Sequence, residues 1–243
     1  MELGTDTSTA DGDKKNLGSH TLTCPTDEAV KQFKYMRRAA AFFIGGAGDK
    51  ESYYGFGPKN NVARAQKSFD NSVIQANYAP GVKSYHLGYN QVIGEENIKT
   101  NVLQELCKSD AVYIVGHSLG GWNGAHLSNH LSGLGYSVKM LITLDPVGEG
   151  ALVGGISNIY SDTPQPRAGL WINILAQSSD SNMSDWIAGI GEQWRLESGP
   201  NVNSIMDVNH EAAGVMYTTA LADGKSALSY MINSVNQHFR GEM

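Results

Sequence analysis

Short, wholly apolar segments alternate with amphipathic ones along most of the chain. Two clear apolar runs are 39-AAAFFIGG-46 and 111-AVYIV-115, and each stops at glycine. A short apolar run bounded by turn residues is typical of a strand buried on both faces of a parallel sheet. The pattern predicts strands at 39–46, 82–89, 111–115, 138–146 and 170–177, with a weaker strand at 194–197.

Apolar residues spaced three and four apart predict helices between these strands. In 61–75, for example, Val62, Ala65 and Phe69 share one face. The same spacing and capping residues predict helices at 26–38, 61–75, 93–107, 119–131, 211–221 and 225–239. Strands that alternate with helices indicate βαβ units, and hence a mostly parallel sheet with helices on both faces. In such sheets, ligands bind at the carboxyl ends of the strands.

The chain divides into a polar beginning and a single folded unit. Residues 1–19 are small, polar and charged, so we expect a disordered tail, followed by one domain over 20–243. We see no apolar run typical of a signal peptide and no stretch of 18 apolar residues. We therefore expect no transmembrane segment, and either a cytoplasmic protein or one exported without a cleavable signal.

The charge of the chain limits the classes of partner it can bind, and its cysteines bear on the redox compartment. The net charge is −6, and the basic residues cluster only in the run Lys31, Lys34, Arg37 and Arg38, which we interpret as a solvated helix face. Because nucleic-acid binding needs a basic surface, we expect no nucleic-acid partner. The two cysteines, Cys24 and Cys107, form no metal-binding pattern. A bridge between them is open, but two free thiols in a reducing compartment are favoured.

The sharpest predicted bend is 116-GHSLGG-121, between a strand and a helix. G-x-S-x-G in this position is a nucleophile elbow, in which a serine projects from a strained turn. Gly116 and Gly120 give clearance around Ser118, because a Cβ there would collide with a neighbouring strand or helix. The turn also directs the backbone N–H of Leu119 toward a developing oxyanion. The alternative is an ordinary glycine-rich turn with a capping serine.

Through G-H-S-L-G-G the chain resembles the α/β-hydrolase family, and in particular its lipase and esterase branch. The resemblance extends from about residue 39 to the C-terminus by order of elements, although only short motifs are specific. It implies a three-layer α/β-hydrolase fold and ester-hydrolysing chemistry. The absence of a signal sequence, together with L-D-P-V at 144–147, is also similar to bacterial phospholipase effectors.

A serine nucleophile needs a base and a carboxylate, and in this fold they follow in the order Ser, acid, His. Asp145 ends a predicted strand and precedes a proline, which disfavours helix there. The L-D-P-V ending is similar to lipases whose acid follows the strand after the nucleophile helix. Asp180, after the next strand, is the rival, and Asp185 is a third choice that we interpret as a helix cap.

His210 is the histidine that fits the required order. It follows the last predicted strand and precedes a helix, where the family places its base. His117 lies within the elbow and is expected to point away from Ser118. His126 and His130 are four apart on a helix, but we interpret them as surface or packing residues because no third ligand is evident.

The second oxyanion donor is expected after the first strand. The resemblance places Ala47 at the donor position, while Gly45 replaces the family's histidine and leaves Gly46 as an alternative. The predicted site is thus Ser118, Asp145 and His210, with Leu119 and Ala47 as oxyanion donors and with neither metal nor cofactor. A calcium site around Asp180, Asn182 and Asp185 is disfavoured, because a full ligand loop is missing.

The hypothesis from the sequence is a serine esterase, lipase or phospholipase that acts on a small-molecule or lipid ester. Loops 51–61 and 148–169 carry apolar and aromatic residues suited to an acyl chain, and 184–194 is a candidate cover for the site. Peripheral contact with a lipid surface is compatible with this hypothesis. The alternative is a catalytically silent protein of the same fold that binds a ligand or partner.

Overall fold

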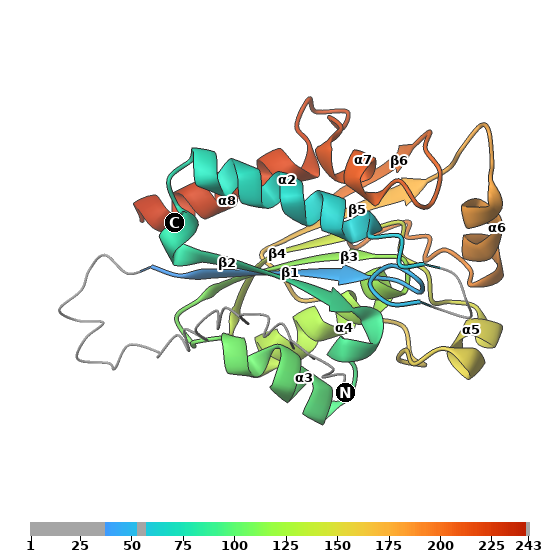
Figure 1. Cartoon of the computed structure of the whole chain (residues 1–243), viewed down its shortest axis with the longest axis horizontal. Helices are drawn as coiled ribbons and strands as arrows, with labels where there is room; N and C mark the ends of the chain where they lie inside the picture. Colours follow the sequence, from blue (N-terminus) through green and yellow to red (C-terminus); the bar gives the residue numbers. More distant parts are fainter. Residues whose placement is uncertain (1–36, 53–56, 242–243) are drawn as a thin grey trace, which may run out of the picture.

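A six-stranded parallel sheet forms the centre of the molecule (Figure 1). The computed structural model describes residues 37–52 and 57–241. The strands are β1 (Ala39–Gly45), β2 (Val82–Gly88), β3 (Ala111–His117), β4 (Ser137–Leu144), β5 (Leu170–Ala176) and β6 (Val202–Met206). Their order across the sheet is β2-β1-β3-β4-β5-β6, and every neighbouring pair is parallel. All carboxyl ends therefore meet at one edge of the sheet.

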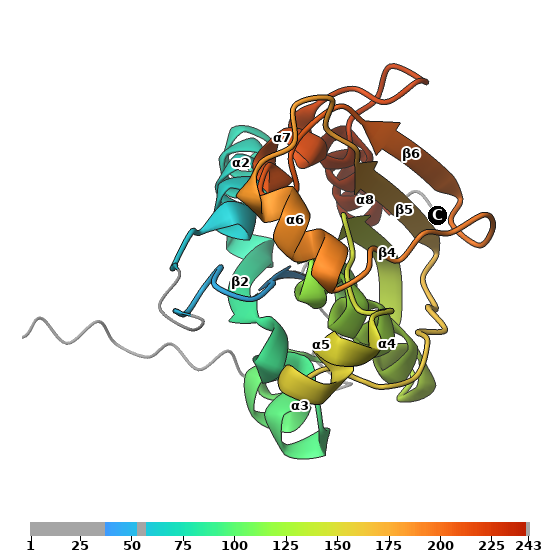
Figure 2. The ribbon, with the colours of Figure 1, turned by 90° about the vertical axis from the view of Figure 1, so that its right-hand side faces the viewer.

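Helices cover both faces of this sheet. One face packs against α2 (Asn61–Gln75), α7 (Ala213–Thr218) and α8 (Ala227–Arg240), and the other against α3 (Glu95–Asn101) and α4 (Leu119–Gly133). Two short helices, α5 (Ala151–Ile156) and α6 (Met183–Ile190), lie beyond the carboxyl ends of the strands, as Figure 2 shows end-on. The predicted three-layer α/β architecture, a mostly parallel sheet with helices on both faces, is confirmed.

The central strands are apolar because each side chain has a helix layer to face. Along β1, Ala39, Ala41 and Phe43 enter the core under α2, α7 and α8. The alternate residues Phe42 and Ile44 enter the core under α3 and α4. Each fully buried Phe or Ile side chain contributes roughly 1.5–3 kcal/mol through the apolar surface it removes from water. The double burial explains why this strand shows no polar alternation in the sequence.

Two predicted secondary-structure elements need correction. The weak strand at 194–197 is wrong, because Trp194 lies in an irregular segment and packs against the rings of Trp122 and Trp171. The last strand is β6, an edge strand whose residues alternate in exposure. The helix predicted over 93–107 is shorter: α3 ends at Asn101 and a 3-10 turn, Leu103–Glu105, follows.

The basic run is only partly a solvated face. Arg38 is largely buried, and its guanidinium pairs with Asp110 at 3.1 Å, so that part of the interpretation is wrong. Cys107 is disulfide-bonded, which corrects the expectation of two free thiols and removes the argument for a reducing compartment. The other cysteine, Cys24, lies outside the described residues.

Several predictions at the beginning of the chain stay predictions. The tail at 1–19, the predicted start of the domain at residue 20 and most of the helix at 26–38 lie outside the described residues. Within the described part of the chain, no helix is both long and apolar enough to cross a membrane.

Candidate active site

Ser118 occupies the strained bend between β3 and α4. Its backbone has φ 57° and ψ −130°, a conformation that costs a non-glycine residue about 1–3 kcal/mol. A Cβ on Gly116 would lie 2.3 Å from the carbonyl oxygen of Gly120, and one on Gly120 would lie 2.2 Å from that of Ile44. Both glycines are therefore required for α4 to approach the sheet so closely. The bend leaves the Ser118 hydroxyl at the carboxyl edge of the sheet.

Asp145 lies at the tip of the neighbouring strand β4. Its backbone φ of 44° turns the chain just before Pro146, and its side chain is fully buried. One carboxylate oxygen, Oδ1, accepts hydrogen bonds from the backbone N–H of Ala176 at 2.9 Å and from Gln193 Nε2 at 2.7 Å. These donors stabilise the charge of a carboxylate that has no contact with solvent.

His210 brings the serine and the aspartate together. It follows β6 in the loop before α7, and its side chain is buried. Its Nε2 lies 3.0 Å from Ser118 Oγ, and its Nδ1 lies 2.6 Å from Asp145 Oδ2. A neutral imidazole matches both contacts when Nδ1–H donates to Asp145 and Nε2 accepts from the Ser118 hydroxyl. Three residues from distant parts of the sequence thus form one hydrogen-bonded chain.

The two other candidate acids lie elsewhere. Asp180 is exposed, and its main-chain oxygen, rather than its carboxylate, accepts the Asn209 amide at 2.8 Å. Asp185 caps α6 by accepting the backbone N–H of Asn182 at 2.8 Å. The structure therefore places Asp145 at His210 and leaves Asp180 outside the hydrogen-bonded chain.

Asp185 also fixes the loop that carries His210. Its Oδ1 accepts the backbone N–H of His210 at 2.7 Å, and its Oδ2 accepts the Asn209 amide at 2.7 Å. Burial raises the pKa of Asp185, but the hydrogen bonds from Asn182, Asn209 and His210 outweigh burial and lower it below its usual value. The carboxylate consequently stays charged and ties the start of α6 to the histidine loop.

Sequence reasoning missed two side chains of this cluster. His117, expected to point away from Ser118, places its ring against that of His210 and directs its Nε2 at the His210 main-chain oxygen, 2.7 Å away. Gln193 contacts Asp145 from an irregular segment. The histidine inside the elbow motif was a visible signal for the first, whereas nothing in the local sequence marks the second.

The two segments that carry the expected oxyanion donors meet at Ser118. Leu119 is the first residue of α4, and the first N–H groups of a helix have no intrahelical partner. Across the site, a Cβ on Gly46 would lie 2.8 Å from Ser118 Oγ, which puts the turn Gly46–Asp49 directly against the Ser118 side chain. Ala47 is the next residue of that turn. Gly45, where the family has histidine, abuts Asp49, whose Oδ2 would lie 2.4 Å from a Cβ there.

Two further histidines, His126 and His130, lie on α4. His126 Nε2 faces the main-chain oxygen of Asp162 at 2.9 Å, and its ring packs on Tyr160. Among the described residues, no group of three or more His, Cys, Asp or Glu side chains is arranged to hold a metal ion.

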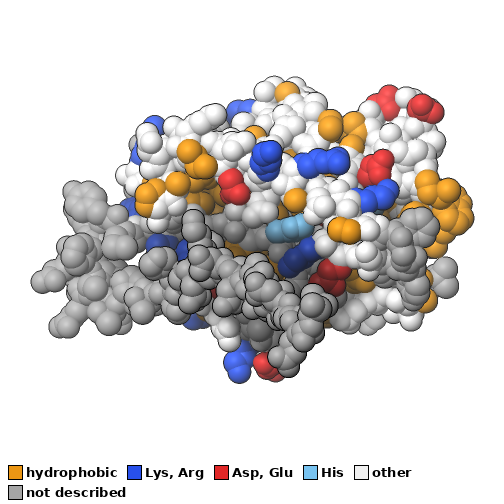
Figure 3. Space-filling view, viewed as in Figure 1, with side chains coloured by type: hydrophobic (Ala, Val, Ile, Leu, Met, Phe, Trp, Pro, Cys, Tyr) orange, Lys and Arg blue, Asp and Glu red, His pale blue; other side chains and the backbone are white. Residues whose placement is uncertain are grey.

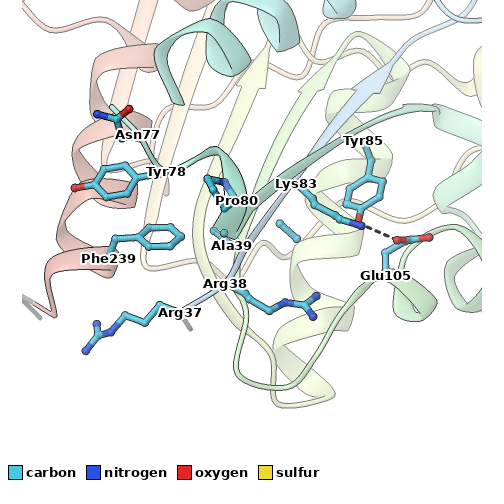
Figure 4. A pocket seen from close by; sticks show the side chains of 12 residues that line it. Arg37, Arg38, Ala39, Asn77, Tyr78, Pro80, Lys83, Tyr85, Glu105 and Phe239 are labelled. Atoms are coloured by element: carbon cyan, nitrogen blue, oxygen red, sulfur yellow. Dashed lines mark hydrogen bonds between the residues drawn. The ribbon is translucent and has the colours of Figure 1, made fainter. Parts of the chain in front are cut away.

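Two hollows lie at opposite ends of the sheet. A cavity of about 260 Å³ is lined by Arg37, Lys83, Tyr85, Glu105 and Phe239, among others, at the amino ends of β1 and β2 (Figure 4). It is remote from Ser118, which follows the carboxyl end of β3. A smaller hollow of about 100 Å³ opens beside Gly46 and includes Lys50, Ser52 and Asn90. Of these two, the smaller one adjoins the candidate site.

An apolar surface marks α6, at the same edge of the sheet. Met183 and Trp186 are about two thirds exposed, and Ile187 and Ile190 are also exposed. Figure 3 shows hydrophobic side chains gathered where Figure 1 places this helix. The predicted cover at 184–194 corresponds to α6 and the segment that follows it.

Comparison with known proteins yields distant likenesses to solved structures. No protein-family model and no curated protein matches the sequence. Among solved structures, the chain is similar to ClbQ from the colibactin NRPS/PKS pathway, with 9% identity, a TM-score of 0.37, and coverage of 84% of this chain and 98% of that one. It is also similar to the metagenomic carboxyl esterase MGS0156, with 9% identity, a TM-score of 0.39, and coverage of 86% and 77%. At these scores neither likeness bears on the substrate.

Proposed function

We propose that the chain is a serine hydrolase that cleaves carboxylic esters, with Ser118 as nucleophile, His210 as base and Asp145 as the acid. One observation carries this proposal: the His210 ring faces Ser118 Oγ with one nitrogen and Asp145 Oδ2 with the other, at 3.0 and 2.6 Å. A serine hydroxyl is a weak nucleophile until a positioned base takes its proton. This geometry supplies the base and the carboxylate that orients it.

The reaction proceeds in two halves. As Ser118 Oγ bonds to the ester carbonyl carbon, His210 Nε2 takes the hydroxyl proton, and the carbonyl oxygen becomes an oxyanion. The N–H groups of Leu119 and Ala47, or of Gly46 in place of Ala47, stabilise that charge. The carbon–oxygen bond to the alcohol then breaks, and the departing oxygen takes the proton from Nε2. Water repeats the sequence on the acyl-enzyme and releases the carboxylic acid.

A lipid ester is the substrate class that the surroundings of the site favour. The exposed side chains of α6, namely Met183, Trp186, Ile187 and Ile190, form an apolar face, and Asp185 links this helix to the His210 loop. Tryptophan and isoleucine on one helix face suit the boundary between water and lipid. A lipase or phospholipase that contacts a lipid surface with α6 is therefore the finer form of the proposal.

Labelling with a fluorophosphonate probe tests the nucleophile. We expect one adduct, on Ser118, and none in Ser118→Ala, while Ser198→Ala, which changes an exposed serine, labels like the wild type. Hydrolysis of p-nitrophenyl esters of rising chain length should fall by several orders of magnitude in Ser118→Ala. A folded wild type that neither labels nor hydrolyses these esters would instead be a silent protein of the same fold.

The substrate class has its own measurement. We expect faster hydrolysis of long-chain than of short-chain esters, and release of fatty acid from phosphatidylglycerol vesicles. Replacing Trp186 by Ser should weaken vesicle binding and leave hydrolysis of a short soluble ester unchanged, because the Trp186 side chain is 64% exposed and is not part of the hydrogen-bonded chain. Equal vesicle binding by both proteins would reject the role of α6.

A further inference from the structure

The carboxylate of Asp145 depends on a glutamine for one of its hydrogen bonds. Its Oδ2 faces His210, while Oδ1 accepts from Ala176 N and Gln193 Nε2 at 2.9 and 2.7 Å. We propose that Gln193 is a positioning residue that holds Asp145 aimed at His210; the proposal rests on the triad role of Asp145 proposed above. A fully buried carboxylate that loses a donor is left with an unsatisfied charge, which is destabilising.

The network around Gln193 leaves its amide one orientation. Nε2 lies between two acceptors, Asp145 Oδ1 and the main-chain oxygen of Ala176 at 2.9 Å. Oε1 accepts from Arg195 Nη2 at 2.6 Å. A flipped amide would set its oxygen against a carboxylate and its NH₂ against a guanidinium, losing three hydrogen bonds. The hydrogen bond from Arg195 therefore favours the amide orientation in which Gln193 Nε2 donates to Asp145.

The backbone of Gln193 is docked onto the residues that follow Asp145. Gln193 forms an antiparallel bridge with Val147, and Trp194 N–H donates to the Pro146 oxygen at 2.7 Å. The buried Trp194 ring then packs against Trp122 and Trp171. These contacts fix the backbone of Gln193, and the fixed backbone places the side-chain amide beside Asp145.

A neutral hydrogen-bond donor is compatible with the proposed role of Asp145, which is to orient His210 and stabilise its imidazolium. A cation at this position would compete with the imidazolium of His210 for the aspartate charge, whereas an amide orients the carboxylate and leaves its charge intact. Of the charged or titratable groups around it, Asp145 and Arg195 contact the amide, and His210 lies beyond Asp145 with His117 behind it. Glu192 is the preceding residue, is exposed, and interacts with Glu149. Of these, Arg195 contacts the amide from the side opposite Asp145 and carries a fixed charge.

Replacing Gln193 by Glu tests the inference with little change of shape. Above neutral pH, the introduced side chain sets a second carboxylate against Asp145, and we expect the rate of Ser118 labelling to fall about 10-fold relative to wild type. As the pH falls, the new carboxylate takes up a proton and donates to Asp145 again, so the ratio of variant to wild-type rates should rise toward one. Gln177→Glu makes the same change on an exposed side chain nearby, and its ratio should stay near one at every pH.

Gln193→Met removes the donor without adding a titrating group. We expect slower labelling at all pH values, and a shift of the downfield proton NMR signal of His210 Nδ1–H, which reports the bond to Asp145 directly. Rates of Gln193→Glu that follow wild type across the pH range, or an unchanged signal in Gln193→Met, would overturn the proposal. Because the NMR signal needs no turnover, a wild type that fails to label would reject the proposed function while this measurement still decides the role of Gln193.

Discussion

His117 and His210 lie ring against ring, with centroids 4.7 Å apart, and Nε2–H of His117 donates to the main-chain oxygen of His210 at 2.7 Å. On the other side of the loop, Asp185 accepts the N–H of the same residue. The peptide groups on both sides of His210 are therefore anchored. This double attachment explains how a loop residue keeps two short contacts at once.

His117 should make stability depend on pH. Burial, and then the neighbouring His210, lower the pKa of His117 to about 4, from 6.5 in the unfolded chain. Between those values the unfolded state binds one more proton than the native state, so stability falls as the pH drops from about 6.5 to about 4. We expect this group alone to remove about 3 kcal/mol across that window.

His117→Gln keeps a donor near Nε2 and removes the titration. Urea unfolding at pH 7 and pH 4.5 should show a smaller loss of stability in this variant than in wild type. His86, His126 and His238 also have pKa values lowered by burial and remain in both proteins, so the difference between them isolates His117. An equal loss in both would contradict the assignment.

Replacing the two rival acids one at a time distinguishes their roles. Asp145→Asn should lower kcat by about 10³- to 10⁴-fold, because an amide at this position favours the wrong tautomer of His210. Asp180→Asn should stay within about twofold of wild type, since the Asp180 side chain is exposed and its hydrogen bonds are made by its main chain. Both are measured with the same p-nitrophenyl ester. The reverse ranking would transfer the acid role to Asp180.

Gly46 should tolerate no side chain. A Cβ there would lie 2.5 Å from Ser118 Cβ, so Gly46→Ala must displace either the turn or Ser118. We expect labelling of Ser118 to slow by more than about 100-fold, in line with the loss of an oxyanion donor. Gly133→Ala, in α4 with nothing within 4 Å of its Cβ, should label normally and gain roughly 0.5–1 kcal/mol of stability. Normal labelling of Gly46→Ala would contradict this prediction and show that the turn moves to accommodate the added methyl group.

The sequence allows the order of elements and the positions of Ser118, Asp145 and His210 to be predicted because each follows a strand in a parallel sheet. Strands such as β1 are apolar throughout, and the bend at Ser118 requires glycines that are visible in the chain. The local sequence pattern therefore predicts the position of a residue wherever its own strand or turn determines its surroundings. The catalytic roles of the three residues stay predictions until the variants are measured.

What sequence reasoning missed depends on contacts between distant segments. Gln193 reaches Asp145 because residues 193 and 194 pair with 146 and 147 and because three tryptophans pack together, and no local periodicity encodes that meeting. The edge strand β6 alternates in exposure and includes the polar residues Asn203 and Ser204, so it lacks the continuous apolar run of the central strands.

The distribution of the four tryptophans has a spectroscopic consequence. Trp122, Trp171 and Trp194 are buried and pack in one cluster, whereas Trp186 is 64% exposed on α6. The native emission should contain a blue component from this buried cluster and a red component from Trp186 that iodide or acrylamide quenches selectively. Fluorescence thus offers, without any attached dye, separate readouts of the protein interior and of the outer helix.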